Sequence, residues 1–149
     1  MCPHIFWVVR VPVPVPVHEF LGNSRGGGPI GRHDPRSRTS GRVPIGLGFL
    51  VFAHEVIGRL PRGRSHLCDQ LTRASTSIVL NLAEGAGKHS KADKRRYYVS
   101  ARGSATESAA LLDVLSRLAL LDEAGHKTGK EMLVRVVSML IKLAQSLEE

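Results

Sequence analysis

The amino-acid sequence predicts an all-α protein: an antiparallel up-and-down four-helix bundle with a disordered N-terminal extension. Three observations support this prediction. From residue 45 onward, apolar residues recur at spacings of three and four, the period of amphipathic helices. No stretch alternates apolar and polar residues as a half-buried strand does. Aromatic residues make up only 5% of the chain, so the core must be filled with Leu, Val, Ile and Ala, which suit helix-on-helix packing.

The first 42 residues have a different composition from the rest of the chain. Val and Pro alternate over residues 11–16, and glycines cluster over residues 26–28. Proline fixes φ and removes a backbone donor, and no apolar period follows. We therefore expect residues 1–42 to be a disordered Pro/Gly/Arg-rich extension and residues 43–149 to form the bundle. A mis-assigned upstream start would explain the extension; a basic arm or a proline-rich ligand is the alternative.

The first helix is expected over residues 45–60, and the second from Arg64 or Ser65 to Gly85. Pro61 ends the first, because proline disfavours helix at the residue before it. One side of the first helix is expected to carry Leu47, Leu50, Val51, His54, Ile57 and Gly58. The second has a single apolar stripe made of Leu67, Leu71, Ala74, Ile78 and Leu82.

The third helix is expected to start after Ser90, which forms an N-cap pattern with Asp93, and to continue to about Leu121. The fourth begins at Asp122 or at Thr128. The apolar or small positions of the third helix are Tyr97, Ala101, Ser104, Ser108, Leu111, Leu115 and Leu118. Those of the fourth are Leu133, Val136, Val137, Leu140, Leu143, Ala144 and Leu147. Short connections between such helices predict antiparallel neighbours.

Charge and cysteine content favour a cytoplasmic protein that binds polyanions. The formal net charge is +8, which favours nucleic acid or an anionic membrane face. The two cysteines, Cys2 and Cys68, do not suggest a disulfide framework. The N-terminal apolar run is too short for a signal peptide, and no stretch is long enough to span a membrane.

The sequence offers no constellation for catalysis, metal binding or a cofactor. Its one Glu-x-x-His pattern, Glu123 to His126, falls at a helix junction, and a di-metal site in a bundle needs a second copy. No phosphate-binding loop or nucleophile elbow is present. We therefore predict a protein that is not an enzyme, with no catalytic residues, metal site or cofactor.

Polar residues interrupt the apolar stripes of the second and third helices. Asn81 and Glu84 lie near the end of one, and Glu107 lies one turn beyond Gly103 and Ser104 on the other. Because an unpartnered buried carboxylate is costly, these residues are expected to bond across the helix pair or to cap backbone amides. Their expected role is to set the register between helices, with small residues allowing close backbone approach.

A basic cluster surrounds the connection between the second and third helices. Its members are Lys88, His89, Lys91, Lys94, Arg95, Arg96 and Arg102. Tyr97 and Tyr98 are interleaved with them. Such a cluster suits phosphate contact together with stacking on exposed bases. The equally weighted alternative is a solvated loop whose tyrosines are buried in the core.

Two segments resemble the signatures of a known family. Residues 70–85, QLTRASTSIVLNLAEG, and residues 97–107, YYVSARGSATE, are similar to those of the small bacterial four helix bundle proteins often encoded within intervening sequences of 23S ribosomal RNA genes. Asn81, Glu84, Gly85, Gly103, Ser104 and Glu107 match signature positions, and we predict a structural role for them. The first helix, with its glycines, and the N-terminal extension depart from the family pattern.

The resemblance implies a ring-like homo-oligomer, a homopentamer, and kinship with the accessory variability proteins of diversity-generating retroelements. It implies no catalytic residues. Together with the charge, it favours a nucleic-acid-binding protein, for RNA or RNA–DNA, that uses Lys88, Lys91, Lys94, Arg95, Arg96 and Arg102. The alternative is a protein-interaction scaffold whose basic face binds an acidic partner such as a polymerase or reverse transcriptase.

Overall fold

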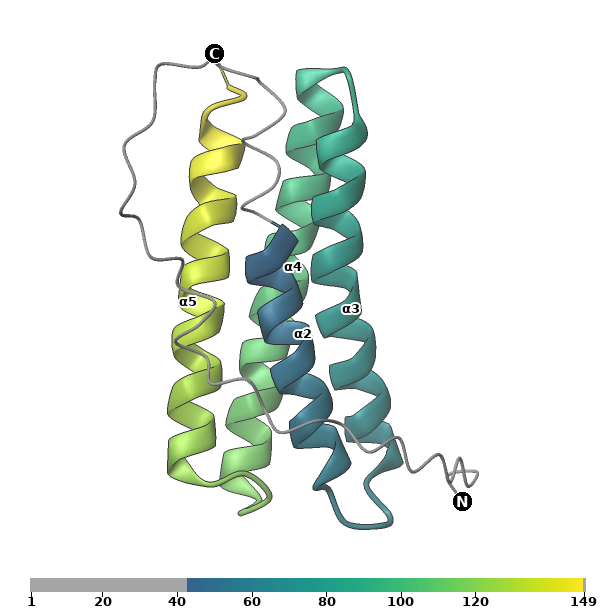
Figure 1. Cartoon of the computed structure of the whole chain (residues 1–149), viewed down its shortest axis with the longest axis vertical. Coiled ribbons are helices and arrows are strands. Elements are labelled where there is room, and N and C mark those ends of the chain that lie inside the picture. The colour runs from purple at the N-terminus through teal and green to yellow at the C-terminus, as the bar shows by residue number, and fades with distance from the viewer. Residues whose placement is uncertain (1–42, 149) are drawn as a thin grey trace, which may run out of the picture. The chain divides into compact units, whose positions relative to one another are not determined.

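Four α-helices account for most of the residues that the computed structural model describes, residues 43–148 (Figure 1). They are α2 (Val43–Gly58), α3 (Ser65–Gly87), α4 (Lys91–Arg117) and α5 (Glu123–Gln145). Over this part of the chain there is no strand, so the predicted all-α class is confirmed. The predicted disordered extension, residues 1–42, lies outside the described residues.

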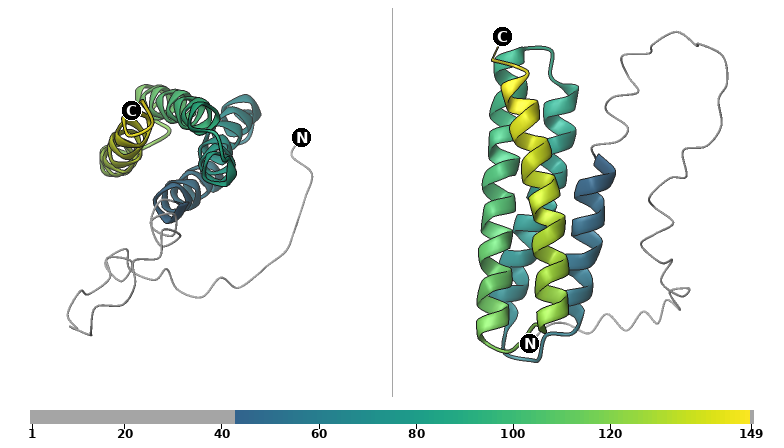
Figure 2. Two further views of the ribbon diagram at one scale, coloured as in Figure 1. Left: turned by 90° about the horizontal axis from the view of Figure 1, so that it is seen from above. Right: turned by 90° about the vertical axis from the view of Figure 1, so that its left-hand side faces the viewer.

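The helices form an up-and-down bundle in which each packs against two others. α3 lies between α2 and α4, and α5 lies between α4 and α2, so helices adjacent in sequence are adjacent in space (Figures 1 and 2). Short connections make successive helices antiparallel, as predicted. No helix in the described range is both long and apolar enough to cross a membrane.

The core is built from one stripe of each helix. The predicted stripe of α3 is confirmed: Leu71 and Ile78 are fully buried, and Leu67, Ala74 and Leu82 are nearly so. In the same layer lie the buried apolar residues of α4 and α5, namely Tyr98, Ala101, Ala105, Leu111, Leu112, Leu115, Leu133, Val136, Leu140, Leu143 and Ala144. Burial of these stripes supplies the main driving force for packing.

The predicted buried side of α2 is wrong. Leu47 and Val51 are 43% and 59% exposed, whereas Phe49, Ala53 and Val56 are buried. Apolar residues surround this helix, so the spacing fits more than one face and the hydrophobic pattern does not choose between them. Packing decides instead: a Cβ on Gly46 would lie 3.1 Å from Leu82 Cδ1, so the small residue allows α2 to approach α3 closely.

The helix boundaries follow local capping. Ser90 caps α4 as predicted, its hydroxyl accepting a 3.4 Å hydrogen bond from the Asp93 amide. α4 ends at Arg117, not near Leu121, because Ala119 adopts a left-handed conformation with φ of 55°. Of the two predicted starts for α5, Asp122 is correct: its carboxylate accepts a 2.8 Å hydrogen bond from the Gly125 amide.

Candidate nucleic-acid interface

The connection from α3 to α4 places the predicted basic cluster at one end of the bundle. α3 ends at Gly87, the Lys88 amide bonds back to the Gly85 carbonyl, and α4 restarts immediately after the Ser90 cap. α2 begins opposite Leu82 of α3, so the last turn of α3 and the first turns of α4 extend beyond it (Figure 1). The cations therefore lie at the end of the bundle where α3 and α4 extend beyond α2.

Two of the predicted nucleic-acid-binding residues are engaged in ion pairs. Arg95 donates to Glu148 Oε1 from Nε and Nη2, at 3.0 and 2.6 Å, and so joins the start of α4 to the end of the chain. Lys88 Nζ lies 3.3 Å from Glu84 Oε2. The Glu84 hydrogen bond is the main cause that raises the pKa of Lys88 above its ordinary value.

The two tyrosines of the cluster have different environments. Tyr98 is only 4% exposed and belongs to the core, so it has no ring face available for a base. Tyr97 is half-buried, and the charged groups of Lys88 and Arg96 lie 5.1 and 5.6 Å from its ring centroid. At these distances both cations are attracted to the ring. Tyr97 therefore holds cations in place, and the predicted stacking role is contradicted for Tyr98.

The remaining cations differ in accessibility. Lys91 and Arg102 are exposed, and within the described range neither forms an ion pair, whereas Lys94 is half-buried. Lys91, Arg95 and Arg102 are spaced by four and seven residues, so they follow one strip of α4. Arg95 pairs with Glu148, so this strip runs beside α5 rather than α3.

A further cation at this end was missed by sequence reasoning. Lys142 is exposed in the last turn of α5, which runs antiparallel to α4 and so ends beside its start. The predicted up-and-down topology was a sufficient signal, because it brings the last turn of the fourth helix to the first turn of the third. With Lys142 included, the cationic surface extends over two helices.

The polar contact between α3 and α4 is centred on Ser77. Its hydroxyl lies 2.9 Å from the Ser104 hydroxyl across the helix pair. Asn81 Nδ2 donates to the Ser77 carbonyl at 2.8 Å and to the Ser77 hydroxyl at 3.0 Å. Asn81 and Ser104 thus meet at one place between the helices, in keeping with the structural role predicted for them.

The two signature glycines occupy opposite kinds of environment. Gly85 is buried against α4: a Cβ there would lie 2.6 Å from Tyr98 Cε1 and 3.1 Å from Tyr97 Cβ. Gly103 is exposed, with nothing within 4 Å of its Cβ position. Gly85 therefore permits a close helix contact, whereas Gly103 makes no such contact within the described bundle.

The predicted placement of the two carboxylates is wrong. Glu84 and Glu107 are exposed rather than part of the buried stripes. Glu84 pairs with Lys88 one turn later on the same side of the connection, not with α4. Each lies about one position outside the buried stripe of its helix, since Gly85 and Ser108 are the buried neighbours. The polar contact between α3 and α4 is half-buried and is made by Ser77 and Ser104 instead.

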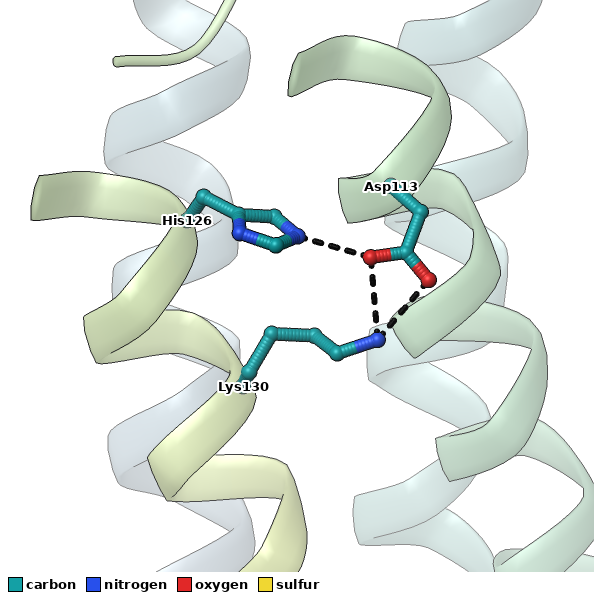
Figure 3. A network of polar contacts seen from close by, with 3 residues as sticks. All are labelled: Asp113, His126 and Lys130. Atoms are coloured by element: carbon teal, nitrogen blue, oxygen red, sulfur yellow. Dashed lines mark hydrogen bonds and ion pairs between the residues drawn. The ribbon is translucent and has the colours of Figure 1, made fainter. Parts of the chain in front are cut away.

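A second polar network joins α4 to α5 (Figure 3). Asp113 Oδ1 lies 2.7 Å from His126 Nε2, and Lys130 Nζ donates to both oxygens of Asp113, at 3.0 and 2.8 Å. The Lys130 hydrogen bond, followed by that of His126, lowers the pKa of Asp113 below its ordinary value. His126 is thus engaged by an aspartate across the helix pair, not by Glu123.

Over residues 43–148, no group of three or more His, Cys, Asp or Glu side chains is placed to hold a metal ion. A single exposed carboxylate bonded to an ammonium group and to a half-buried imidazole favours a structural contact between the two helices.

A comparison with protein-family sequence models gives a match that spans most of the bundle. The family described as 23S rRNA-intervening sequence protein matches residues 49–142, more than half of the chain. This chain belongs to that family. The resemblance drawn from residues 70–85 and 97–107 is thereby confirmed, and every candidate residue from Asn81 to Glu107 lies inside the range matched by the 23S rRNA-intervening sequence protein family.

A solved structure supports the fold of this 23S rRNA-intervening sequence protein. It is a protein with unknown function from the S23 ribosomal protein family of Bacteroides thetaiotaomicron. The TM-score is 0.67 at 20% sequence identity, and the match covers 72% of this chain and 97% of the other. At that identity the likeness shows a shared fold. No match was found among curated proteins.

Proposed function

We propose that this 23S rRNA-intervening sequence protein is a non-enzymatic, self-assembling protein that binds nucleic acid, RNA or an RNA–DNA hybrid, at the α3–α4 end of its bundle. The observation that carries the proposal is the exposed cationic strip of α4. Lys91, Arg95 and Arg102 follow this strip, and Lys142 of α5 lies at the same end.

The physical basis is phosphate contact with release of counterions. Lys91 and Arg102 are eleven positions apart, which is about 16 Å along a helix, so they reach different phosphates of one strand or duplex. Arg96 and Lys88 stand over Tyr97, and this arrangement limits the freedom they lose on binding. With Tyr98 buried, binding through backbone charge is favoured over base stacking.

A second candidate function is a scaffold for an acidic protein such as a polymerase or reverse transcriptase. The observation in its favour is that this end already binds carboxylates: Arg95 holds Glu148 and Lys88 holds Glu84. An acidic partner would compete for the same cations.

Self-assembly into a ring-like homopentamer remains a prediction from the family resemblance. The predicted location remains the cytoplasm. Absence of catalytic activity is likewise part of the proposal. Asp113 bonds to both His126 and Lys130, and we assign this contact a structural role between α4 and α5.

The proposal is tested by measuring binding of the full chain to structured RNA, duplex DNA and an RNA–DNA hybrid. The Lys91→Ala/Arg102→Ala variant removes two exposed cations of the strip. The matched control, Arg59→Ala/Arg62→Ala, removes two exposed cations near the α2–α3 connection, at the opposite end of the bundle. We expect the first variant to bind about tenfold or more weakly than the control.

Two results would contradict the proposal. Equal loss in both variants would mean that only net charge matters, and the α3–α4 end would have no special role. Wild-type binding no stronger than that of an unrelated protein of equal net charge would make the acidic-protein scaffold the better explanation. Unchanged melting of both variants controls for folding, because the replaced side chains are exposed.

A further inference from the structure

Glu148 lies beside the cationic strip of α4, just past the end of α5. The chain beyond α5 continues in tight turns, in which the amides of Leu147 and Glu148 donate to the carbonyls of Ala144 and Gln145, at 3.2 and 3.1 Å. Leu147 is half-buried against the core and anchors these turns. The last turn of α5 and the first turn of α4 lie at the same end of the bundle (Figure 1). The Glu148 side chain is therefore held next to the start of α4.

Two nitrogen atoms of the Arg95 guanidinium group donate to the Glu148 carboxylate. Nε lies 3.0 Å and Nη2 lies 2.6 Å from Oε1. These two donors form one edge of the guanidinium fork, and arginine binds carboxylate and phosphate oxygens with such edges. The Arg95 and Glu148 side chains are 47% and 53% exposed, so a ligand can reach the pair from solvent. A phosphate group and the Glu148 carboxylate therefore compete for the same donors.

Arg95 is the middle cation of the strip. Lys91 lies four positions before it and Arg102 lies seven positions after it, about 6 Å and about 10 Å along the helix. Lys91 and Arg102 form no ion pair within the described range, so Arg95 is the strip residue whose charge is offset. A nucleic-acid strand that follows the strip brings a phosphate close to Arg95 and meets the negative charge of Glu148 there.

Glu148 is the acidic group best placed to act on the strip. Between Glu131 and Glu148, α5 and the turn after it contain no acidic residue. Asp93, in the first turn of α4, is two positions from Arg95 and so lies on a different side of the helix. A single carboxylate therefore opposes phosphate contact at this part of the strip.

We propose that the Arg95 guanidinium group is a phosphate site whose place is taken, in the free protein, by the Glu148 carboxylate. A phosphate of a bound strand and Glu148 exclude each other on the same two donors, so Glu148 sets the affinity of the strip. An exposed ion pair of this kind is weak, so a polyanion displaces the carboxylate at a cost in affinity. The inference deepens the proposed function and rests on it for the nature of the polyanion.

Removal of the Glu148 charge tests the competition. Glu148→Gln keeps the length of the side chain and makes Arg95 available to phosphate. We expect this variant to bind structured RNA or an RNA–DNA hybrid about fivefold more tightly than wild type. The slope of log Kobs against log salt concentration should steepen by about 0.7–0.9, the contribution of one phosphate contact. Glu131→Gln is the matched control and should bind like wild type, because it removes an exposed acid of α5 about 25 Å farther along the helix.

The gain must depend on Arg95. In a double-mutant cycle, Glu148→Gln is also made in the Arg95→Gln background, where the competition no longer exists. We expect no gain in that background. An equal gain in both backgrounds would mean that Glu148 acts only through net charge, and would overturn the inference. Thermal melting by circular dichroism verifies folding, and all variants should melt like wild type because the pair is exposed.

Inorganic tripolyphosphate is a second probe, which does not require nucleic-acid binding. Isothermal titration calorimetry at low salt should show that Glu148→Gln binds it more tightly than wild type, and only when Arg95 is present. This result in a chain that binds no nucleic acid would leave the phosphate site in place and refute the proposed function. Equal binding of wild type and Glu148→Gln to both probes would refute the phosphate site and leave the proposed function to its own test.

Two further results would also overturn the inference. Weaker binding of both probes by Glu148→Gln would show that Glu148 orients Arg95 for phosphate and does not compete with it. A gain in affinity for poly-glutamate without a gain for tripolyphosphate or nucleic acid would assign Arg95 to the carboxylates of an acidic protein.

Discussion

Replacing Gly85 with alanine tests whether the close contact between α3 and α4 at the basic end is obligatory. The new Cβ would lie 2.6 Å from Tyr98 Cε1 and 2.9 Å from Tyr98 Cδ1. These atoms belong to a ring that is 4% exposed, so the ring has little room to turn away. The helices must separate or the ring must leave its position.

The magnitude follows from two opposing effects. Overpacking of this kind costs about 1–3 kcal/mol, and a 2.6 Å approach places Gly85→Ala near the upper end. Alanine gains back at most about 1 kcal/mol of helix propensity. The net loss in free energy of unfolding is therefore about 2 kcal/mol, which lowers the melting temperature by about 10 °C for a domain of this size.

Gly103→Ala is the matched control, because this glycine is also in a helix and belongs to the second signature segment. Nothing lies within 4 Å of its Cβ position, so only the propensity gain of up to about 1 kcal/mol remains. Both variants are compared with wild type by thermal melting and urea unfolding at one protein concentration. A Gly85→Ala protein as stable as wild type would refute the reasoning, since the clash would then be relieved without cost.

Three further predictions concern other contacts of the bundle. Asp113→Asn should lower the free energy of unfolding by at most about 1 kcal/mol at neutral pH, because the network is half-exposed. The pKa of Asp113 is lowered, mainly by Lys130, so its contribution is full above the ordinary value of 3.8 and lost as the pH falls through the lower folded-state pKa. Denaturant unfolding at a series of pH values should show the two proteins converging in strong acid; a constant difference would contradict this. Ser77→Ala should destabilise more than Ser104→Ala, by about 1 kcal/mol, because the Ser77 hydroxyl bonds to the side chains of Ser104 and Asn81, whereas the Ser104 hydroxyl bonds to the Ser77 side chain and to the Ser100 carbonyl of its own helix. Equal urea midpoints would exclude this ranking. Gly129→Ala should lower the melting temperature, because its Cβ would lie 2.6 Å from side-chain atoms of both α2 and α4, and a raised melting temperature would show that the site accommodates a methyl group.

Most of the fold was predictable because its helices carry one clear apolar stripe. The stripe of α3 through Leu71 and Ile78 was predicted residue by residue, Ser90 marked the start of α4 correctly, and Asp122 was the correct one of two predicted starts for α5. α2 was the exception. Its apolar residues surround the helix, so its buried side depends on the tertiary contact of Gly46 with Leu82, which no local pattern contains.

The candidate site was predictable in position but not in detail. The sequence placed the cations at one helix connection, yet the pairing of Arg95 with Glu148 depends on the end of α5 returning to the start of α4. Tyr97 and Tyr98 are adjacent and chemically alike, and the rotation of α4 buries only one of them. Glu84 and Glu107 were misplaced by about one position, because the edge of a helical stripe is set by packing and not by spacing.

The salt dependence of nucleic-acid binding tests the central claim most directly. Each phosphate contact contributes about 0.7–0.9 to the slope of log Kobs against log salt concentration. The account predicts that Lys91→Ala/Arg102→Ala lowers the magnitude of this slope by about 1.4–1.8 relative to wild type, while Arg59→Ala/Arg62→Ala leaves it unchanged. Equal slopes for wild type and both variants would contradict the assignment of nucleic-acid binding to the α3–α4 end.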